Sequence, residues 1–305
     1  MILVAEELDP KGLALLEEAS YPYRYEPELW RDRKCLLTQL DRVTALIVRN
    51  RIRVDRELLE SAPQLRVVGR LGTGLDNVDR LALGAKEIAL VYAPGANASA
   101  VAEYVLAALF YLARNLARAA QGGDRLALGG VELAGKTLGL VGLGEVGLRT
   151  ARKARALGMN VVGYDPLRQP WEAVVEITEV QLLSFEEVLS RADFLSLHTP
   201  LTRETRGLIG EEALAQMHPG AYLINTARGG LVDHGALAEA LQKGRLAGAV
   251  LDVTEPEPLP EDHPLSHLPN CLVTPHIAGL TKEAQARVGE RVVRGVLEVL
   301  RARTA

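Results

Sequence analysis

Short apolar runs recur along the chain, and helical patterns fill the intervals between them. Each run is short enough to form one buried strand and too short to cross a membrane. The runs are Ile2–Ala5, Ala45–Val48, Leu65–Val68, Ile88–Tyr92, Thr137–Val141, Val161–Tyr164, Phe194–Leu197, Ala221–Asn225, Ala249–Leu251 and Cys271–Thr274. Strands that alternate with helices are typical of α/β folds, in which helices cover both faces of a parallel sheet. The pattern therefore predicts doubly wound parallel sheets.

Helix signals between these runs suggest how the chain is divided. Asp9-Pro10 supplies an N-cap and a first-turn proline, and Ser184–Glu187 forms a capping box. A long, apolar helical pattern runs from Asn97 to Gln121 and ends at Gly122-Gly123. The segment Thr281–Arg303 has valines at helical spacing. We expect one α/β unit, a bridging helix, a second α/β unit, and a last helix that returns to the first unit.

The stretch Thr137–Pro166 carries a nucleotide-binding pattern. An apolar run leads into Gly142, Gly144 and Gly147, and a second run ends at Asp165. In such a turn the first glycine permits the bend, the second lets a pyrophosphate approach the backbone, and the third brings the helix close. An acid at the end of the second strand accepts hydrogen bonds from ribose hydroxyls and repels a 2′-phosphate, so NAD is favoured over NADP. The alternative is a glycine-rich turn that binds nothing.

Composition narrows the possible partners. The 305 residues suit two domains, and a net charge of −4 gives no reason to expect nucleic acid or a membrane surface as partner. Cys35 and Cys271 have no metal-binding spacing, so we expect reduced thiols, no metal and a cytoplasmic protein. Met1 is followed at once by a strand pattern, and Glu103 interrupts the apolar stretch Val101–Ala113. We therefore expect neither a signal peptide nor a membrane span.

Polar groups suited to hydride transfer follow three of the predicted strands. Arg228, Glu257 and His276 come after the runs that end at Asn225, Leu251 and Thr274. An arginine can bind the carboxylate of a 2-hydroxy acid, a histidine can exchange its hydroxyl proton, and an acid can raise the histidine pKa. Each residue alone could equally be an exposed ring, a surface ion pair or one acid of an acidic loop.

Seven ordered motifs extend this pattern over the whole chain. They are GRLGTGLDNVD at 69–79, ASAVAEYV at 98–105, GLGEVG at 142–147, HTPLTRETRGLI at 198–209, NTARGGLVD at 225–233, LDVTEPEPLP at 251–260 and TPHIAG at 274–279. The chain thereby resembles the D-isomer-specific 2-hydroxyacid dehydrogenases, and among them the phosphoglycerate dehydrogenases. The resemblance implies that Arg228 binds substrate and that Glu257 pairs with His276, the acid/base. It implies NAD contacts from Thr73, Glu145, Val146, Asp165, Thr199, Ala227, Asp252 and Gly279.

The resemblance also implies a Rossmann-type NAD domain inserted in a flavodoxin-like substrate domain. The substrate domain would comprise residues 1–95 and 281–305, and the NAD domain residues 96–280. Family members are commonly homodimers, held through the segment that includes the helix after Asn97. Glu145 departs from the family pattern, in which arginine often lies beside the pyrophosphate, so we expect weaker cofactor binding unless it points away. No C-terminal regulatory domain follows Ala305, so we expect no feedback inhibition through one.

A phosphorylated hydroxy acid is the expected substrate. Arg49 and Arg51 lie at alternate positions after a strand and could bind a phosphate, as the resemblance implies. The alternative is an exposed basic turn before the helix at Asp55. The turn Gly72-Thr73-Gly74 lacks a third glycine, and beside Arg70 its amides could hold the substrate carboxylate.

The leading hypothesis is NAD-dependent oxidation of D-3-phosphoglycerate. The same chemistry would serve a glyoxylate or hydroxypyruvate reductase, or another D-2-hydroxyacid dehydrogenase. An NAD-sensing binding protein resembling transcriptional corepressors is a further alternative, because such proteins also keep the arginine, acid and histidine. Formate dehydrogenase is disfavoured, since its small substrate needs neither the two arginines nor Glu257.

Overall fold

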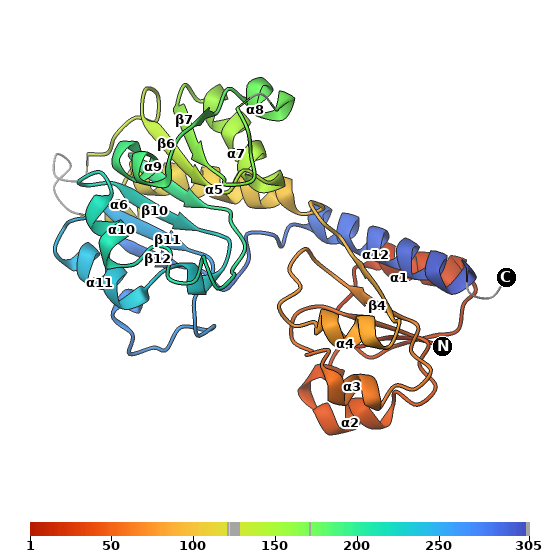
Figure 1. The fold of residues 1–305 in the computed structure, drawn as a ribbon. Coiled ribbons are helices and arrows are strands. Elements are labelled where there is room, and N and C mark those ends of the chain that lie inside the picture. Colours follow the sequence, from red (N-terminus) through yellow and green to blue (C-terminus); the bar gives the residue numbers. More distant parts are fainter. Residues whose placement is uncertain (121, 123–128, 171, 303–305) are drawn as a thin grey trace. The chain divides into compact units, whose positions relative to one another are not determined.

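The computed structural model describes residues 1–120, 122, 129–170 and 172–302 (Figure 1). By its internal contacts the chain divides into two compact units, Met1–Asn97 with Leu280–Ala305, and Ala98–Gly279. Each unit is an α/β fold with its own parallel sheet, which confirms the predicted fold class.

The first unit contains a five-stranded parallel sheet in the order β2-β1-β3-β4-β5. Its strands are β1 (Ile2–Val4), β2 (Tyr23–Tyr25), β3 (Ala45–Val48), β4 (Val67–Arg70) and β5 (Ala89–Tyr92). Its helices are α1 (Pro10–Glu18), η1 (Leu29–Arg31), α2 (Arg33–Thr38), α3 (Arg56–Glu60), α4 (Arg80–Ala85) and α12 (Lys282–Ala302). Successive strand residues face opposite ways, so the sheet has two buried faces. Leu46 and Val48 of β3 pack in the core with α2, α3 and α4, whereas Ile47 packs with α1 and α12.

Local signals explain several of these elements. Asp9 caps α1, because its Oδ1 accepts hydrogen bonds from the amides of Lys11 and Gly12 at 2.9 and 3.2 Å. Gly69 lets α12 lie against β4, since a Cβ there would be 2.8 Å from a methyl group of Val296. Figure 1 shows α12 beside α1, with which it is in contact.

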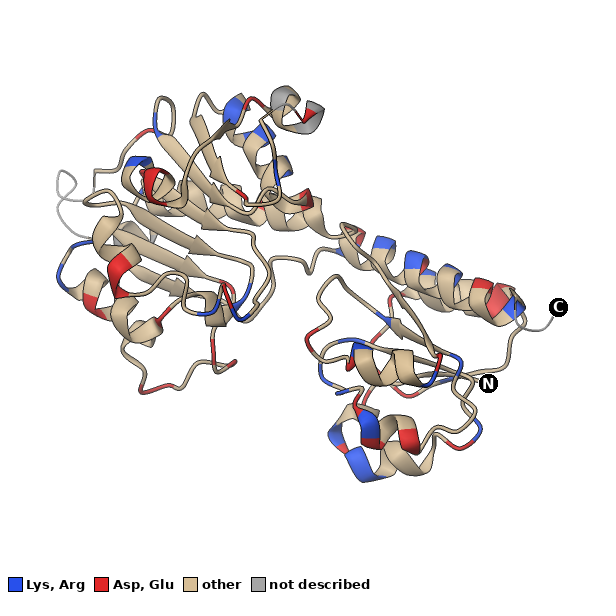
Figure 2. Ribbon diagram, in the orientation of Figure 1, with Lys and Arg blue, Asp and Glu red and all other residues tan. Residues whose placement is uncertain are grey.

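The second unit contains a seven-stranded parallel sheet in the order β12-β11-β10-β9-β6-β7-β8. Its strands are β6 (Thr137–Val141), β7 (Asn160–Tyr164), β8 (Gln181–Leu182), β9 (Phe194–Leu197), β10 (Tyr222–Asn225), β11 (Gly248–Leu251) and β12 (Cys271–Val273). Its helices are α5 (Ala98–Ala113), α6 (Leu116–Ala120), α7 (Glu145–Ala156), α8 (Ala173–Thr178), α9 (Phe185–Arg191), α10 (Glu211–Gln216), α11 (His234–Gln242), and the short η2 (Gly229–Leu231) and η3 (Pro264–Ser266). These strands contain no charged residue and are drawn wholly in tan in Figure 2, as expected for a sheet buried between two helical layers.

The single long helix predicted from Asn97 to Gln121 is wrong. The structure has two helices, α5 and α6, and the break between them lies at Asn115, whose φ is +50°. Asparagine tolerates this left-handed conformation better than most residues, and it ends α5 without a glycine. The predicted helix was expected to end at Gln121, before Gly122-Gly123, but Gln121 and Gly123 lie outside the described residues.

Two strands were not predicted. β2 has only half-exposed tyrosines and an arginine, and β8 has two residues, so neither produces an apolar run. Among the described residues, no helix is both long enough and apolar enough to cross a membrane.

Candidate active site

The glycine-rich turn after β6 gives each glycine a different physical role. Gly142 has φ +96°, and a Cβ there would lie 2.7 Å from the backbone of His198. A Cβ on Gly147 would lie 2.2 Å from the carbonyl oxygen of Gly142, so this glycine lets α7 approach the turn. Gly144, the N-cap of α7, has no atom within 4 Å of its Cβ position. The turn therefore leaves open space at the helix N-terminus, where a pyrophosphate can bind backbone amides.

Asp165 lies next to this turn and is held by backbone amides. Its Oδ2 accepts from Leu143 at 2.8 Å and its Oδ1 accepts from Leu167 at 2.9 Å. A carboxylate has about four acceptor positions, so each oxygen keeps capacity for a ribose hydroxyl.

Three more residues expected at the cofactor lie at the same edge of this sheet. Val146 is in the first turn of α7, Thr199 follows β9, and Ala227 follows β10. The hydroxyl oxygen of Thr226 is buried without a protein partner, and a buried polar atom of this kind is commonly satisfied by a ligand or by water. The residues present thus fit a dinucleotide.

Glu145 pairs with a cation on its own helix. Its Oε2 lies 3.1 Å from a guanidinium nitrogen of Arg149, one turn along α7, and both side chains are about half exposed or more. This pairing offsets part of the negative charge near the pyrophosphate site.

The three candidate catalytic side chains come from loops at the carboxyl edge of the same sheet. Arg228 follows β10, Glu257 lies between β11 and β12, and His276 follows β12. The Nδ1 atom of His276 lies 2.9 Å from Oε1 of Glu257. His276 has φ +57°, a conformation that is uncommon for residues other than glycine. Its side chain is 43% exposed, so a substrate can reach it.

The loop of Arg228 is fixed by buried contacts. The amide of Asn225, which is fully buried, donates to the carbonyl oxygen of Arg228 at 2.9 Å and its Oδ1 accepts from Ala227 at 3.0 Å. A Cβ on Gly229 would lie 2.1 Å from the carbonyl carbon of Thr254, so the arginine loop lies directly against the loop that leads to Glu257.

Asp252, expected at the cofactor, is only 1% exposed and binds the histidine loop. Its Oδ1 accepts from the hydroxyl of Thr274 at 2.6 Å and from the amide of Ile277 at 2.8 Å, and its Oδ2 accepts from the amide of Ala278 at 2.8 Å. These donors come from both sides of His276 in the sequence.

In the first unit, the loop after β3 wraps around a buried carboxylate. Glu6 is 2% exposed and accepts from the amides of Arg49, Arg51 and Ile52 at 2.9, 3.2 and 3.0 Å. Because three amides hold one carboxylate, the backbone that carries the two arginines is well ordered.

The guanidinium groups of the two arginines have different environments. Arg49 donates to the side chain of Gln285 and to the carbonyl oxygen of Glu7, and burial lowers the pKa of Arg49. Arg51 is exposed and stacks on Trp30, with 4.2 Å between its guanidinium carbon and the ring centroid. Arg51 is therefore the more accessible cation.

The turn after β4 carries the other expected substrate residues. Gly72 has φ +150°, and a Cβ there would lie 1.7 Å from a guanidinium nitrogen of Arg70. The Gly72 amide donates to the carbonyl oxygen of Arg70 at 2.9 Å, so this amide is engaged within the turn. Gly74 completes the turn, and Thr73, which was expected to contact NAD, lies on it with its hydroxyl 3.0 Å from Oδ1 of Asn97.

Comparisons with known proteins show to which family the chain belongs. Residues 105–278 match the family model of the D-isomer specific 2-hydroxyacid dehydrogenase NAD binding domain. The chain belongs to this family. A (S)-sulfolactate dehydrogenase of Chromohalobacter salexigens is 45% identical over 304 residues, 98% of each chain. A D-3-phosphoglycerate dehydrogenase of Methanocaldococcus jannaschii is 40% identical over 310 residues, which span 100% of this chain but 58% of that protein. The crystal structure of TT0316 protein from Thermus thermophilus has a TM-score of 0.91 and 38% identity, covering 99% of this chain and 97% of that one.

The protein is thus an NAD-dependent D-2-hydroxyacid dehydrogenase. NAD supplies the hydride acceptor in this chemistry, and the glycine turn, Asp165 and Thr226 are the groups of this dehydrogenase that fit the dinucleotide.

One half-buried histidine of the dehydrogenase, His198, was not predicted as a site residue from the sequence. The Nε2 atom of His198 lies 3.0 Å from the hydroxyl of Ser196, and its backbone touches the glycine turn at Gly142. Part of the residue reaches solvent, but burial of the imidazole lowers its pKa to about 4, so the ring is neutral near pH 7. Its position directly after a predicted strand was the available signal.

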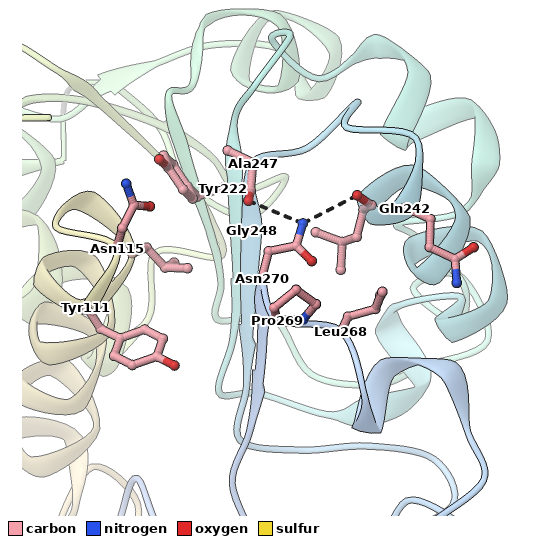
Figure 3. Close-up of a pocket in the computed structure, with 11 residues that line it drawn as sticks. Tyr111, Asn115, Tyr222, Gln242, Ala247, Gly248, Leu268, Pro269 and Asn270 are labelled. Carbon is pink, nitrogen blue, oxygen red and sulfur yellow. Dashed lines mark hydrogen bonds between the residues drawn. The ribbon is translucent and has the colours of Figure 1, made fainter. Parts of the chain in front are cut away.

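A cavity of about 460 Å³ lies at the opposite, amino edge of this sheet (Figure 3). Its walls include Tyr111 of α5, Tyr222 at the start of β10, and Asn270 just before β12. Arg228, Glu257 and His276 do not line it, so the cavity is separate from the candidate catalytic groups.

Proposed function

We propose that this dehydrogenase oxidises D-3-phosphoglycerate to 3-phosphohydroxypyruvate with NAD, the entry step of serine synthesis. The His276–Glu257 pair at the carboxyl edge of the NAD-binding sheet carries the chemical part of this proposal. In this proposal the unit Ala98–Gly279 binds the dinucleotide, and the two arginines expected at the substrate phosphate belong to the unit Met1–Asn97 with Leu280–Ala305.

The catalytic roles follow from the charge and position of each side chain. Arg228 binds the carboxylate of the substrate and polarises the oxygen that becomes a carbonyl. His276 accepts the hydroxyl proton at Nε2, since Nδ1 faces Glu257. Glu257 fixes the imidazole orientation and stabilises the imidazolium that forms. The carbon that bears the hydroxyl loses a hydride, for which bound NAD would be the acceptor, and the hydroxyl loses its proton to His276, so the alcohol becomes a carbonyl in a two-electron oxidation.

The accessible guanidinium of Arg51 and the order of its loop support a second anion on the substrate. A phosphate is the kind of anion that the Arg51 guanidinium could bind, and Arg49 adds a second positive charge in the same loop. The similarity to phosphoglycerate dehydrogenases supports the same substrate, although this chain spans only 58% of the length of the Methanocaldococcus jannaschii relative.

Sulfolactate is the second candidate, because the similarity to a (S)-sulfolactate dehydrogenase extends over 98% of both chains. Sulfolactate is also a three-carbon 2-hydroxy acid with a second anion on its third carbon. In the ranking that defines the R and S labels, the sulfur places the third carbon of sulfolactate above the carboxyl group. In D-3-phosphoglycerate the carboxyl group ranks above the third carbon. The (S) label of sulfolactate therefore denotes the same spatial arrangement as that of D-3-phosphoglycerate. Both substrates therefore present the same hand to His276, but the sulfonate is one atom shorter and carries one charge less.

Initial rates with a matched panel test the proposal. We expect the highest kcat/KM with D-3-phosphoglycerate, a lower value with (S)-sulfolactate, and much lower values with D-glycerate and D-lactate, which lack the second anion. A higher kcat/KM for sulfolactate would assign the second candidate. If glyoxylate or hydroxypyruvate is reduced with a kcat/KM equal to that for D-3-phosphoglycerate, the result would favour a reductase whose substrate needs no second anion.

We also propose a homodimer in the cytoplasm. Phe110 on α5 and Leu116 on α6 are 45% and 49% exposed, as expected for side chains that a second copy covers. Cys35 and Cys271 are both free thiols, which is typical of the reducing cytoplasm. Sedimentation equilibrium of the purified protein gives the mass, and a monomeric mass at micromolar concentration would contradict the dimer.

A further inference from the structure

A chain of hydrogen bonds connects helix α5 to the loop that carries His276. The hydroxyl of Tyr104 lies 2.5 Å from Oγ1 of Thr274, and that Oγ1 lies 2.6 Å from Oδ1 of Asp252. Tyr104 is on α5, whereas Thr274 and Asp252 follow the neighbouring strands β12 and β11. The chain therefore joins one helix to two strand ends of the same unit.

The direction of these hydrogen bonds is fixed by the carboxylate at the end. An ionised carboxylate can only accept, so the Thr274 hydroxyl donates to Asp252. The same hydroxyl has no second proton, so Tyr104 donates to Thr274. Burial raises the pKa of Tyr104, which keeps the phenol protonated and able to donate.

Asp252 connects this chain of hydrogen bonds to the backbone around His276. Its carboxylate accepts from the amides of Ile277 and Ala278, and its carbonyl oxygen accepts from the amide of His276 at 2.9 Å. A buried carboxylate that loses one of its donors is destabilised, and it then seeks another partner or water. Loss of the Thr274 hydroxyl bond would therefore loosen the loop on both sides of His276.

His276 requires such support because of its backbone conformation. A φ of +57° is unfavourable for a residue with a Cβ, and such conformations persist only where surrounding contacts hold them. A small change in this loop would change the distance from His276 to Glu257 and to the substrate hydroxyl, to which proton transfer is sensitive.

We propose that Tyr104 is a positioning residue of this dehydrogenase, acting through Thr274 and Asp252 on His276. The inference rests on the proposed acid/base role of His276. Tyr104 does not touch the reacting atoms in this account, and its phenol serves as the outermost donor of the chain.

The test compares Tyr104→Phe with a matched control on the same helix. Tyr104→Phe removes one hydroxyl and keeps the ring. Tyr111→Phe makes the same change two turns along α5, at the wall of the cavity in Figure 3. We expect Tyr104→Phe to lower kcat about threefold to tenfold, the usual effect of one lost hydrogen bond, with little change in KM for NAD. Tyr111→Phe should keep wild-type kcat.

A double-mutant cycle tests whether Tyr104 acts through Thr274. Thr274→Val should lower kcat at least as much as Tyr104→Phe, and the double variant should be no slower than Thr274→Val alone. Thr274→Ser keeps the hydroxyl and should restore most of the activity. Wild-type kcat in Tyr104→Phe, or effects that multiply in the double variant, would overturn the proposal.

A readout that does not use turnover separates this inference from the proposed function. Diethylpyrocarbonate modifies neutral imidazoles, and mass spectrometry gives the rate at His276 alone. We expect this rate to change at least about threefold in Tyr104→Phe and to stay at the wild-type value in Tyr111→Phe. An unchanged rate in Tyr104→Phe would overturn the positioning role even if His276→Asn abolishes turnover. Turnover that survives in His276→Asn would instead remove the acid/base role, whatever the modification rates show.

Discussion

Nδ1 of the His276 imidazole lies 2.9 Å from Oε1 of the Glu257 carboxylate, although the two residues are 19 positions apart in the sequence. Both side chains remain about two-fifths exposed, so the pair is open to a substrate. With Nδ1 directed at the carboxylate, Nε2 is the ring atom that can exchange a proton with a hydroxy acid.

His276→Asn should therefore lower kcat by at least roughly a hundredfold, because asparagine cannot accept the substrate proton. Glu257→Gln should lower kcat less than His276→Asn does, since the neutral amide still meets the imidazole but stabilises the imidazolium less than a carboxylate. Steady-state rates between pH 5 and 9 measure both effects. His267→Asn, an exposed histidine before β12, is the control and should behave as wild type.

Arg51→Ala should raise KM for D-3-phosphoglycerate about tenfold and leave KM for glyoxylate unchanged, because glyoxylate has a carboxylate but no second anion for Arg51 to bind. Arg49→Ala should lower the Tm and should raise KM for the two substrates with less difference between them, since the half-buried Arg49 contacts Gln285 and Glu7. Arg53→Ala removes an exposed charge in the same loop and is the control. Equal increases of KM for both substrates in Arg51→Ala would argue against a phosphate site.

Most strands were predictable because a strand that is buried on both faces of its sheet appears in the sequence as a continuous apolar run. The runs at Ala45–Val48, Thr137–Val141 and Phe194–Leu197 form strands with the same bounds in the structure. β2 and β8 were missed since they lie at sheet edges, where polar residues are tolerated. The break at Asn115 was missed because one residue in a left-handed conformation hardly changes the apolar period of a helix.

The candidate site could be predicted as types of residue at strand ends, but not as a network of contacts. Parallel strands bring their carboxyl ends to one edge, so three strand ends in the sequence predict Arg228, Glu257 and His276 at the same edge. The donors around Asp252 and the three amides around Glu6 are tertiary contacts of the backbone, and side-chain patterns do not reveal them.

The unfolding free energy should depend on pH through His198. The pKa of His198 is about 4 in the folded protein, whereas an exposed histidine in the unfolded chain has its ordinary value of 6.5. Between these two pH values the unfolded chain therefore binds more protons than the folded protein. Stability should therefore fall as the pH drops from about 6.5 to about 4, and this contribution is fully lost below about pH 4. Burial also lowers the pKa of His234, which adds a contribution of the same sign.

Urea unfolding at pH 7, 6, 5 and 4 measures this effect. His198→Gln keeps an amide near Ser196 but does not titrate, so its unfolding free energy should fall less steeply than that of wild type. Carboxylates titrate equally in both proteins, and the difference between the two curves isolates His198. His218→Gln, an exposed control, should follow the wild-type curve, and an identical slope in His198→Gln would contradict the prediction.

Two alanine substitutions in the glycine turn should separate folding from cofactor binding. A methyl group on Gly147 would lie 2.2 Å from the carbonyl oxygen of Gly142, a backbone atom that cannot move aside alone, so Gly147→Ala should destabilise the fold by about 1–3 kcal/mol. A methyl group on Gly144 would have no protein atom within 4 Å, and the backbone of this residue is extended. The Tm of Gly144→Ala should therefore stay close to that of wild type. The same methyl group would occupy the approach of the pyrophosphate to the amides of α7, so the Kd for NADH should rise roughly tenfold. Thermal unfolding and NADH fluorescence titration measure the two effects, and wild-type affinity in Gly144→Ala would move the pyrophosphate away from this turn.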